Sequence, residues 1–385
     1  MLPVYLDHAA TTPVASEVLQ AMMPYFHRAF GNPSAIYTIG QEAREAIEHA
    51  REQVARLVNA DADDVYFTSG GTESDNWAIK GVARAWGNRK SHLITTPIEH
   101  HAVLEACKAL QEMGWEITFV PVDSSGLVDP DDVRRAITAR TGLITIMHAN
   151  NEVGTIEPVA EIGAIAREHG IPFHTDAVQT VGKIRVDMDA LNADMLSISA
   201  HKLYGPKGVG ALVVRRGTPL RPLLDGGGQE RGRRGGTYNV PGIVGFGVAA
   251  ERALRCGAEE MERVRALRDR LVEGIMERVP DAILTGHPVI RLPNNAHLAF
   301  ADVEGESLVL SLDAAGIYCS AGAACSSGDT EPSHVLVAMG IDPRLIEGSV
   351  RFTLGKDNTE EQIDYTVEQV ARAVQKLRSL RVSRL

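Results

Sequence analysis

The sequence has little of what marks secreted, membrane-spanning or disulfide-rich proteins. Four of its 385 residues are cysteines, Cys107, Cys256, Cys319 and Cys325, and so few thiols give no disulfide framework. No apolar run approaches the roughly 20 residues of a membrane span, and the N-terminus carries no export signal. These absences favour a protein of the reducing cytoplasm that acts away from membranes.

Positive charge is also scarce. The chain has 39 Lys and Arg against 50 Asp and Glu, a formal net charge of −11, which argues against a general nucleic-acid surface. The Gly- and Arg-rich run at residues 226–237 is one short segment without interleaved aromatics, so it does not indicate RNA binding. What is present suits a large globular core, with 44% hydrophobic and 23% charged residues.

Strand and helix patterns alternate along the first half of the chain. Helical stretches separate most of the short apolar runs, and this alternation predicts an α/β fold with a mainly parallel sheet. The runs that predict strands are residues 65–67, 93–96, 117–122, 143–148, 172–175 and 195–199.

The C-terminal part has a different organisation. Two helical patterns, 244–253 and about 259–279, flank a break at residues 255–258, and strands mix with helices beyond it. We therefore predict a large domain over residues 15–255 and a smaller α+β domain over residues 256–385.

Two predicted strands end in residues that can serve one cofactor. Asp176 follows the strand at 172–175, and Lys202 follows the strand at 195–199; ligands of open α/β sheets bind at such strand ends. A desolvated lysine can form a Schiff base, and a carboxylate keeps the ring nitrogen of pyridoxal phosphate (PLP) protonated. Alone, Lys202 is typical of a surface lysine and Asp176 of a helix cap. Together they favour a PLP site.

Donors for the other polar groups of PLP lie close by in the sequence. Ser199 and His201 flank the lysine and suit a phosphate, and Gln179 is placed to donate to the ring oxygen. The run Ser69-Gly-Gly-Thr72 joins a strand to a helix, where free N–H groups bind anions, so Gly71 and Thr72 are further phosphate candidates. This run lacks the Gly-Lys-Ser/Thr ending of a nucleotide loop. An ordinary glycine turn is the alternative.

These blocks resemble the class V, fold type I PLP enzymes, and most closely the cysteine desulfurases. The resemblance implies PLP fold type I, with a seven-stranded-type, mainly parallel sheet in the large domain, and it places residues 1–14 with the small domain. The matching blocks keep their order across nearly the whole chain, at residues 5–13, 67–76, 148–154, 199–208 and 350–355.

The resemblance also implies roles for individual side chains. His100 would stack on the cofactor ring and could move protons, whereas His101 is expected at the surface. Asn151 and Arg351 would bind the substrate carboxylate. Thr237 would reach the phosphate of a neighbouring subunit, so a homodimer is expected.

The segment around Cys325 selects the reaction. Small residues surround this thiol, which favours an exposed loop, whereas Cys319 follows a strand-like apolar run and is expected to pack. The family pattern is Ser-Gly-Ser-Ala-Cys, and Ala323 replaces its second serine, so the tuning of this thiol is open. By resemblance Cys325 is the catalytic nucleophile. It would ligate metal only if an iron–sulfur cluster were shared with a scaffold partner.

The predicted activity is the conversion of L-cysteine to L-alanine, with sulfur left on Cys325 as a persulfide. Lys202 would hold PLP and then move the substrate Cα proton. A sulfur-acceptor or iron–sulfur scaffold protein is the expected partner; iron–sulfur assembly, nitrogenase maturation and tRNA thiolation all stay open. The alternatives are a selenocysteine lyase, another class V enzyme such as a transaminase, and a non-catalytic sulfur carrier. A pure carrier would have no need for the pair Asp176 and Lys202.

Overall fold

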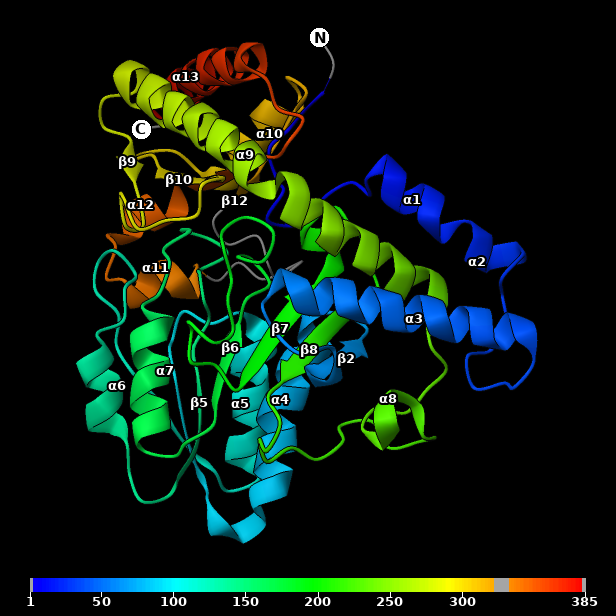
Figure 1. Ribbon diagram of the computed structural model, residues 1–385. Helices are drawn as coiled ribbons and strands as arrows, with labels where there is room; N and C mark the ends of the chain where they lie inside the picture. Colours follow the sequence, from blue (N-terminus) through cyan, green and yellow to red (C-terminus); the bar gives the residue numbers. More distant parts are fainter. Residues whose placement is uncertain (1–2, 322–331, 383–385) are drawn as a thin grey trace.

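The computed structural model describes residues 3–321 and 332–382 (Figure 1). Its largest sheet has seven strands in the order β2-β8-β7-β6-β5-β3-β4; β8 is antiparallel to both neighbours, and the other pairs are parallel. The strands are β2 (Val65–Thr68), β3 (His92–Thr95), β4 (Glu116–Phe119), β5 (Thr141–Thr145), β6 (Phe173–Asp176), β7 (Met195–Ser199) and β8 (Gly210–Val214).

This sheet confirms the predicted α/β fold class. Every predicted strand is present, with some ends displaced by a few residues. Strand β8 was not predicted. The connection from Ser199 to Gly210 holds only a short 3₁₀ turn, η3 (Ala200–Lys202), and is too short for a parallel crossover, so the chain returns antiparallel.

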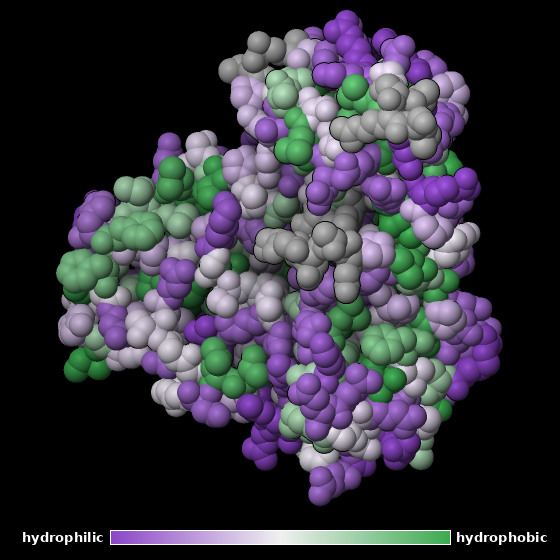
Figure 2. Space-filling model, turned by 180° about the vertical axis from the view of Figure 1, so that it is seen from behind, coloured by the Kyte–Doolittle hydropathy of each residue, from purple (hydrophilic) through white to green (hydrophobic). Residues whose placement is uncertain are grey.

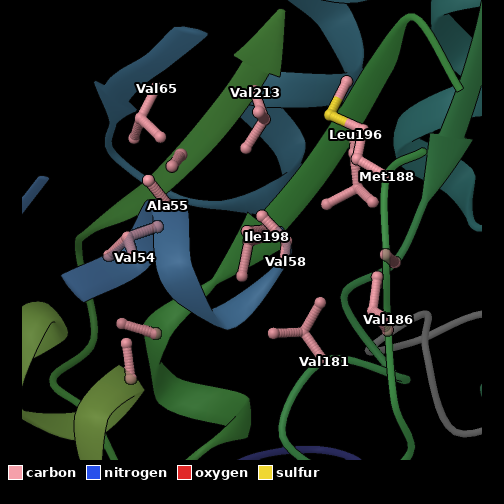
Figure 3. Close-up of a cluster of buried hydrophobic side chains, with 14 of the residues drawn as sticks. Val54, Ala55, Val58, Val65, Val181, Val186, Met188, Leu196, Ile198 and Val213 are labelled. Atoms are coloured by element: carbon pink, nitrogen blue, oxygen red, sulfur yellow. The ribbon is translucent and has the colours of Figure 1, made fainter. Parts of the chain in front are cut away.

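Helices cover both faces of the sheet, and successive residues of a strand enter different cores. Leu93 joins the core under α4 and α5, while Ile94 joins the core under α3. Figure 3 shows Val58, which directly follows α3, beside Ile198 of β7 within this second core. The helices of this part are α1 (Ser16–Met22), α2 (Pro24–His27), α3 (Thr38–Leu57), α4 (Gly71–Trp86), α5 (His101–Glu112), α6 (Pro130–Ala136), α7 (Val159–Glu168) and α8 (Gln229–Gly232).

The predicted break at residues 255–258 is wrong, because α9 runs without interruption over Val240–Arg278. A glycine inside a helix, here Gly257, costs only about 1 kcal/mol relative to alanine, and packing along the helix outweighs it. Residues up to Ala253 belong to the core of the large sheet, and residues from Met261 belong to another core. The domain boundaries themselves stay a prediction.

The core reached by the second half of α9 surrounds a four-stranded antiparallel sheet in the order β12-β13-β10-β9. Strand β1 pairs with β11, so the start of the described chain lies with its C-terminal part. Within residues 3–321 and 332–382, no helix has an apolar stretch long enough to cross a bilayer. The remaining elements are β1 (Val4–Tyr5), β9 (Ile283–Leu284), β10 (Asn295–Ala299), α10 (Gly305–Asp313), β11 (Ile317–Tyr318), β12 (Ser320–Ala321), α11 (His334–Ala338), α12 (Pro343–Glu347), β13 (Ser349–Thr353) and α13 (Glu360–Val382).

Candidate active site

A cavity of about 240 Å³ lies where β2, β5, β6 and β7 end. With the exception of Thr237, every residue expected to hold the cofactor lines it, and so does Asn151. The lining residues are Gly71, Thr72, Asp75, His100, Met147, Asn151, Asp176, Val178, Gln179, Ser199, His201 and Lys202. The roles of these residues stay predictions, although the structure brings them together from five separate segments of the chain.

The N-terminus of α4 forms one wall of this cavity. Gly70 precedes the helix with φ of 152°, a conformation that favours glycine. A side chain at Gly210 would come within 2.7 Å of the Gly70 Cα, and one at Gly71 within 2.9 Å of a Val178 methyl. Glycines therefore let the backbone close tightly around an anion site at the positive end of α4.

The carboxylate of Glu73, in the first turn of α4, does not compete with a bound anion for that site. Glu73 accepts a hydrogen bond from the Ser69 N–H at 2.8 Å, and it pairs with Arg234 at 2.8 Å. Its negative charge is therefore neutralised at the helix end. Thr72 and Ser199 line the cavity beside it and can donate hydroxyl groups to a phosphate.

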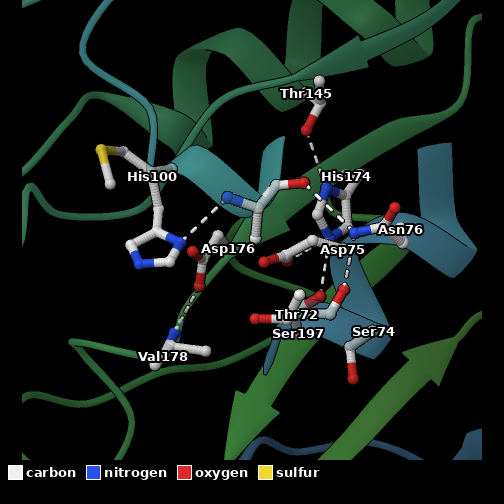
Figure 4. Close-up of polar contacts among 12 residues, drawn as sticks. Thr72, Ser74, Asp75, Asn76, His100, Thr145, His174, Asp176, Val178 and Ser197 are labelled. Atoms are coloured by element: carbon white, nitrogen blue, oxygen red, sulfur yellow. Dashed lines mark hydrogen bonds and ion pairs between the residues drawn. The ribbon is translucent and has the colours of Figure 1, made fainter. Parts of the chain in front are cut away.

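Two buried carboxyl groups form the floor of the cavity (Figure 4). Asp176 Oδ1 accepts a hydrogen bond from the Val178 N–H at 2.9 Å, and burial raises the pKa of Asp176 to about 6. Burial and the charge of Asp176 raise the pKa of Asp75 well above its usual range, and its Oδ1 has no hydrogen-bond partner among the described residues. A cationic group placed between them, such as a protonated ring nitrogen, would offset the cost of burying these carboxyls.

Sequence reasoning missed Asp75. The signal was a polar residue on the buried face of α4, where Ala78, Ile79 and Val82 fill the core. Asp75 is 1% exposed and reaches the sheet, because His174 Nε2 lies 3.7 Å from its Oδ1. Met147 and Val178, the apolar lining residues, carried no chemical signal in the sequence.

His100 is held as a neutral imidazole. It caps α5, and its Nδ1 accepts a hydrogen bond from the Ala102 N–H at 3.1 Å, so this nitrogen carries no proton. Burial and the charge of Lys202 lower the pKa of His100 to about 4. His101 is exposed, as expected, with its ring centroid 4.8 Å from that of His334.

Lys202 ends η3 and contacts the N-terminal segment. Its Nζ donates to the carbonyl oxygens of Ala9 and Ala10, the latter at 2.7 Å. His201 Nδ1 lies 3.0 Å from the Thr11 hydroxyl, and burial lowers the pKa of His201 to about 4. The segment at residues 9–12 therefore closes over the lysine turn.

Arg351 lies on β13 and is not among the residues that line the cavity, but it contacts Asn151, which does line it. Its Nη1 donates to the Asn151 carbonyl at 2.9 Å, and its Nη2 to Asp7 at 2.9 Å. Within the described part of the chain, the buried Nε has no hydrogen-bond partner. Asp7 was not predicted, although it lies inside the matching block at residues 5–13. The guanidinium of Arg351 therefore contacts Asn151, the residue expected to bind the substrate carboxylate with it.

Of the two neighbouring cysteines, the structure describes Cys319. Cys325 and Ala323 lie outside the described residues, so the role of this thiol stays a prediction, as does metal binding through it. Cys319 packs on the core around the four-stranded sheet, and burial raises the pKa of its thiol to about 12, in keeping with a structural cysteine. Thr237 is exposed beyond α8 and is not among the residues that line the cavity.

Comparison with known proteins defines the class. A family model described as "Aminotransferase class-V" matches residues 4–366. The chain therefore belongs to the class-V aminotransferase family, whose members use PLP.

Individual relatives and solved structures within this class resemble the chain over nearly its whole length. The chain is 53% identical to "Cysteine desulfurase IscS" of Dictyoglomus turgidum, with 98% of this chain and 96% of the relative covered. It is also 53% identical to the protein of that name from Methanosarcina thermophila, at 98% and 93% coverage. A solved "NifS-like protein" superposes with TM-score 0.92 at 42% identity, covering 97% of this chain and all of that one. The structure "SspA in complex with cysteine" gives TM-score 0.82 at 39% identity, covering 92% and 100%.

Proposed function

We propose that the protein is a PLP-dependent cysteine desulfurase, which converts L-cysteine to L-alanine and keeps the sulfur as a persulfide on Cys325. The observation that carries this proposal is the single cavity that Lys202 and Asp176 share with the N-terminus of α4. That donor set offers an amine for the aldehyde, a carboxylate for the ring nitrogen and an anion site for the phosphate. The relatives named cysteine desulfurase support the choice of substrate.

In this proposal different lining residues bind different parts of the cofactor. Asp176 takes the ring nitrogen, Gln179 the ring oxygen and His100 one face of the ring. The phosphate is bound by residues at the start of α4 and around η3, namely Gly71, Thr72, Ser199 and His201. Bound PLP would supply the electron sink that lets bonds at the substrate Cα and Cβ break.

The chain's own groups then carry the reaction. Arg351 and Asn151 bind the substrate carboxylate, and Lys202 moves the Cα proton. The thiolate of Cys325 attacks the substrate sulfur: the S–S bond forms as the Cβ–S bond breaks, and the electron pair of that bond stays with the substrate carbon. Protonation at Cβ then gives the methyl group of alanine.

We also propose a homodimer. Large apolar side chains are exposed around α1 and α2, and Figure 2 shows hydrophobic residues gathered on that side of the molecule. Such a patch marks a protein–protein contact more often than free surface. A second subunit there would let Thr237 complete the neighbouring phosphate site. The exposed residues are Leu19, Met23, Phe26, Phe30, Ile36 and Tyr37.

The proposed setting is the cytoplasm, with a sulfur-acceptor or iron–sulfur scaffold protein as partner. Three thiols of the described chain, Cys107, Cys256 and Cys319, are free, which suits a reducing compartment. The test of the function is an assay of alanine and sulfide from L-cysteine, with and without added PLP. Turnover that needs PLP is expected. Protein that retains PLP but releases neither product would contradict the proposal.

A further inference from the structure

Lys183 is a buried lysine that the proposed chemistry does not use. It is 8% exposed and lies seven residues after Asp176, in the turn that follows β6. Within the described ranges no carboxylate pairs with it; the charged groups acting on it, Lys202 and Arg351, are both positive. His8 and His201 feel its charge in turn. Burial and these charges lower the pKa of Lys183 to about 7.

Both hydrogen bonds of the Lys183 ammonium go to one residue. Its Nζ donates to the Gln179 carbonyl at 2.9 Å and to the Gln179 side-chain Oε1 at 3.2 Å. Nζ is the donor in both contacts, so the oxygen end of the Gln179 amide faces it. The NH₂ end is thereby directed the other way, where Nε2 donates to the Ala9 carbonyl at 3.1 Å.

The same Ala9 carbonyl also accepts a hydrogen bond from Lys202 Nζ. Lys183, Gln179, Ala9 and Lys202 therefore form one continuous chain of hydrogen bonds along the cavity wall. One N–H of the Gln179 amide is used in this chain. The other is left for a ligand oxygen, since Gln179 lines the cavity.

A purely structural role accounts poorly for this arrangement. The bond to the Gln179 carbonyl four residues back would satisfy a lysine that only closes a turn. Burying an ammonium without a carboxylate is costly, and a methionine of similar length would fill the space without that cost. The contact that a methionine cannot replace is the one to the side-chain oxygen of Gln179.

We infer that Lys183 is a positioning residue, which fixes the orientation of the Gln179 amide so that its NH₂ end faces the cavity. This inference rests on the proposed function, because the acceptor of that NH₂ group would be the ring oxygen of PLP. It adds to that function a second lysine, which acts on the cofactor only through Gln179.

The test compares Lys183→Met, Gln179→Leu and the double variant with the wild type, all loaded with PLP and without cysteine. Each single variant is expected to weaken PLP binding by about three- to tenfold, the size of one hydrogen bond. Each should also move the pH midpoint of the bound cofactor's visible absorption upward, because the ring oxygen loses a donor. The double variant should be no worse than the worse single variant, since both changes remove one interaction.

Matched controls keep the result specific. Lys90 also donates to a backbone carbonyl, that of Ala139, but it precedes β3, at the opposite end of the strands from the cavity, so Lys90→Met should change neither readout. Thermal unfolding of the apoproteins checks folding. If Lys183→Met does not fold, Lys183→Gln replaces it: this side chain keeps a donor but can present either end of its amide, so the same upward shift is expected.

Additive effects in the double variant, or a Lys183→Met protein with wild-type affinity and midpoint, would overturn the inference alone. Wild-type protein that takes up PLP yet makes no alanine would overturn the proposed function and leave these readouts intact. A wild type that takes up no PLP would overturn both.

Discussion

Lys202 is the residue on which the proposed chemistry depends. Lys202→Ala should lose covalent PLP after borohydride reduction, and turnover should fall by about 10² to 10⁴, the range for a general acid–base group. Peptide mapping of the reduced protein provides the measurement. The control is Lys207→Ala, an exposed lysine five residues on, which should keep both the tag and the activity. A tag on any other lysine would contradict the assignment.

The raised pKa of Asp176 leads to a prediction of how PLP affinity depends on pH. Its pKa of about 6 means that the carboxylate is ionised above that pH and neutral below it. Because the ionised form pairs with the protonated ring nitrogen, PLP affinity should fall as the pH drops through 6.

The phosphate of PLP also titrates near 6, so wild type alone does not isolate Asp176. Asp176→Asn removes the carboxylate and keeps the shape. Its PLP affinity should be lower at pH 8 and should change less steeply between pH 8 and pH 5 than that of the wild type. Equal slopes in absorbance titrations of the two apoproteins would count against the role of Asp176.

The sequence predicted which residues meet at the strand ends. Asp176 and Lys202 could be placed at one cavity because each follows an apolar run, and parallel strand ends share one edge; their roles stay a prediction. Asp75, Asp7 and Lys183 could not, because their partners come from distant segments or lie four residues away in an unpredicted turn. Spacing in the sequence does not show such contacts.

At the scale of elements, a buried ion pair holds the loop that carries Thr237. Arg51 of α3 and Glu230 of α8 are each 2% exposed and 2.8 Å apart. Glu230 also accepts a hydrogen bond from the Phe67 N–H of β2. Glu230 has φ of 44°, in the left-handed region that costs a non-glycine residue energy. The pair therefore stabilises an otherwise unfavourable turn.

Glu230→Ala should lower the free energy of unfolding by about 3–5 kcal/mol, because Arg51 would stay buried without a partner. It should also weaken PLP retention, since the Thr237 loop loses its anchor. The exposed pair of Arg134 and Glu168 supplies the control: solvent screens this pair, so Glu168→Ala should leave the free energy of unfolding nearly unchanged. Equal losses in denaturant unfolding of the two variants would show that the buried pair is not the anchor.

Elements were predicted better than their connections. The apolar runs located the strands correctly, because a run with both faces buried has few other places to pack. The break in α9 was predicted from local composition around Gly257, and the packing of the helix on two cores outweighs that local signal. The left-handed turn of α8 had no recognisable sequence pattern, because it depends on the distant residue Arg51.

At the scale of the whole molecule, the proposed dimer can be tested by complementation. Lys202→Ala and Thr237→Ala subunits are each expected to bind PLP poorly. A mixed dimer should regain one wild-type site, because intact Lys202 of one subunit then meets intact Thr237 of the other. The measurement is PLP retained per mixed dimer, with each pure variant as reference. No recovery, or a monomer that retains PLP fully, would contradict an intersubunit role for Thr237.

The proposed function as a whole is tested most directly by locating the sulfur. PLP-loaded protein is exposed briefly to L-cysteine, and its peptides are examined by mass spectrometry for a persulfide, alongside an alanine assay. We predict a persulfide on Cys325, absent in Cys325→Ser, and an unchanged result in Cys319→Ser. A persulfide on Cys319, or full alanine production by Cys325→Ser, would contradict the account.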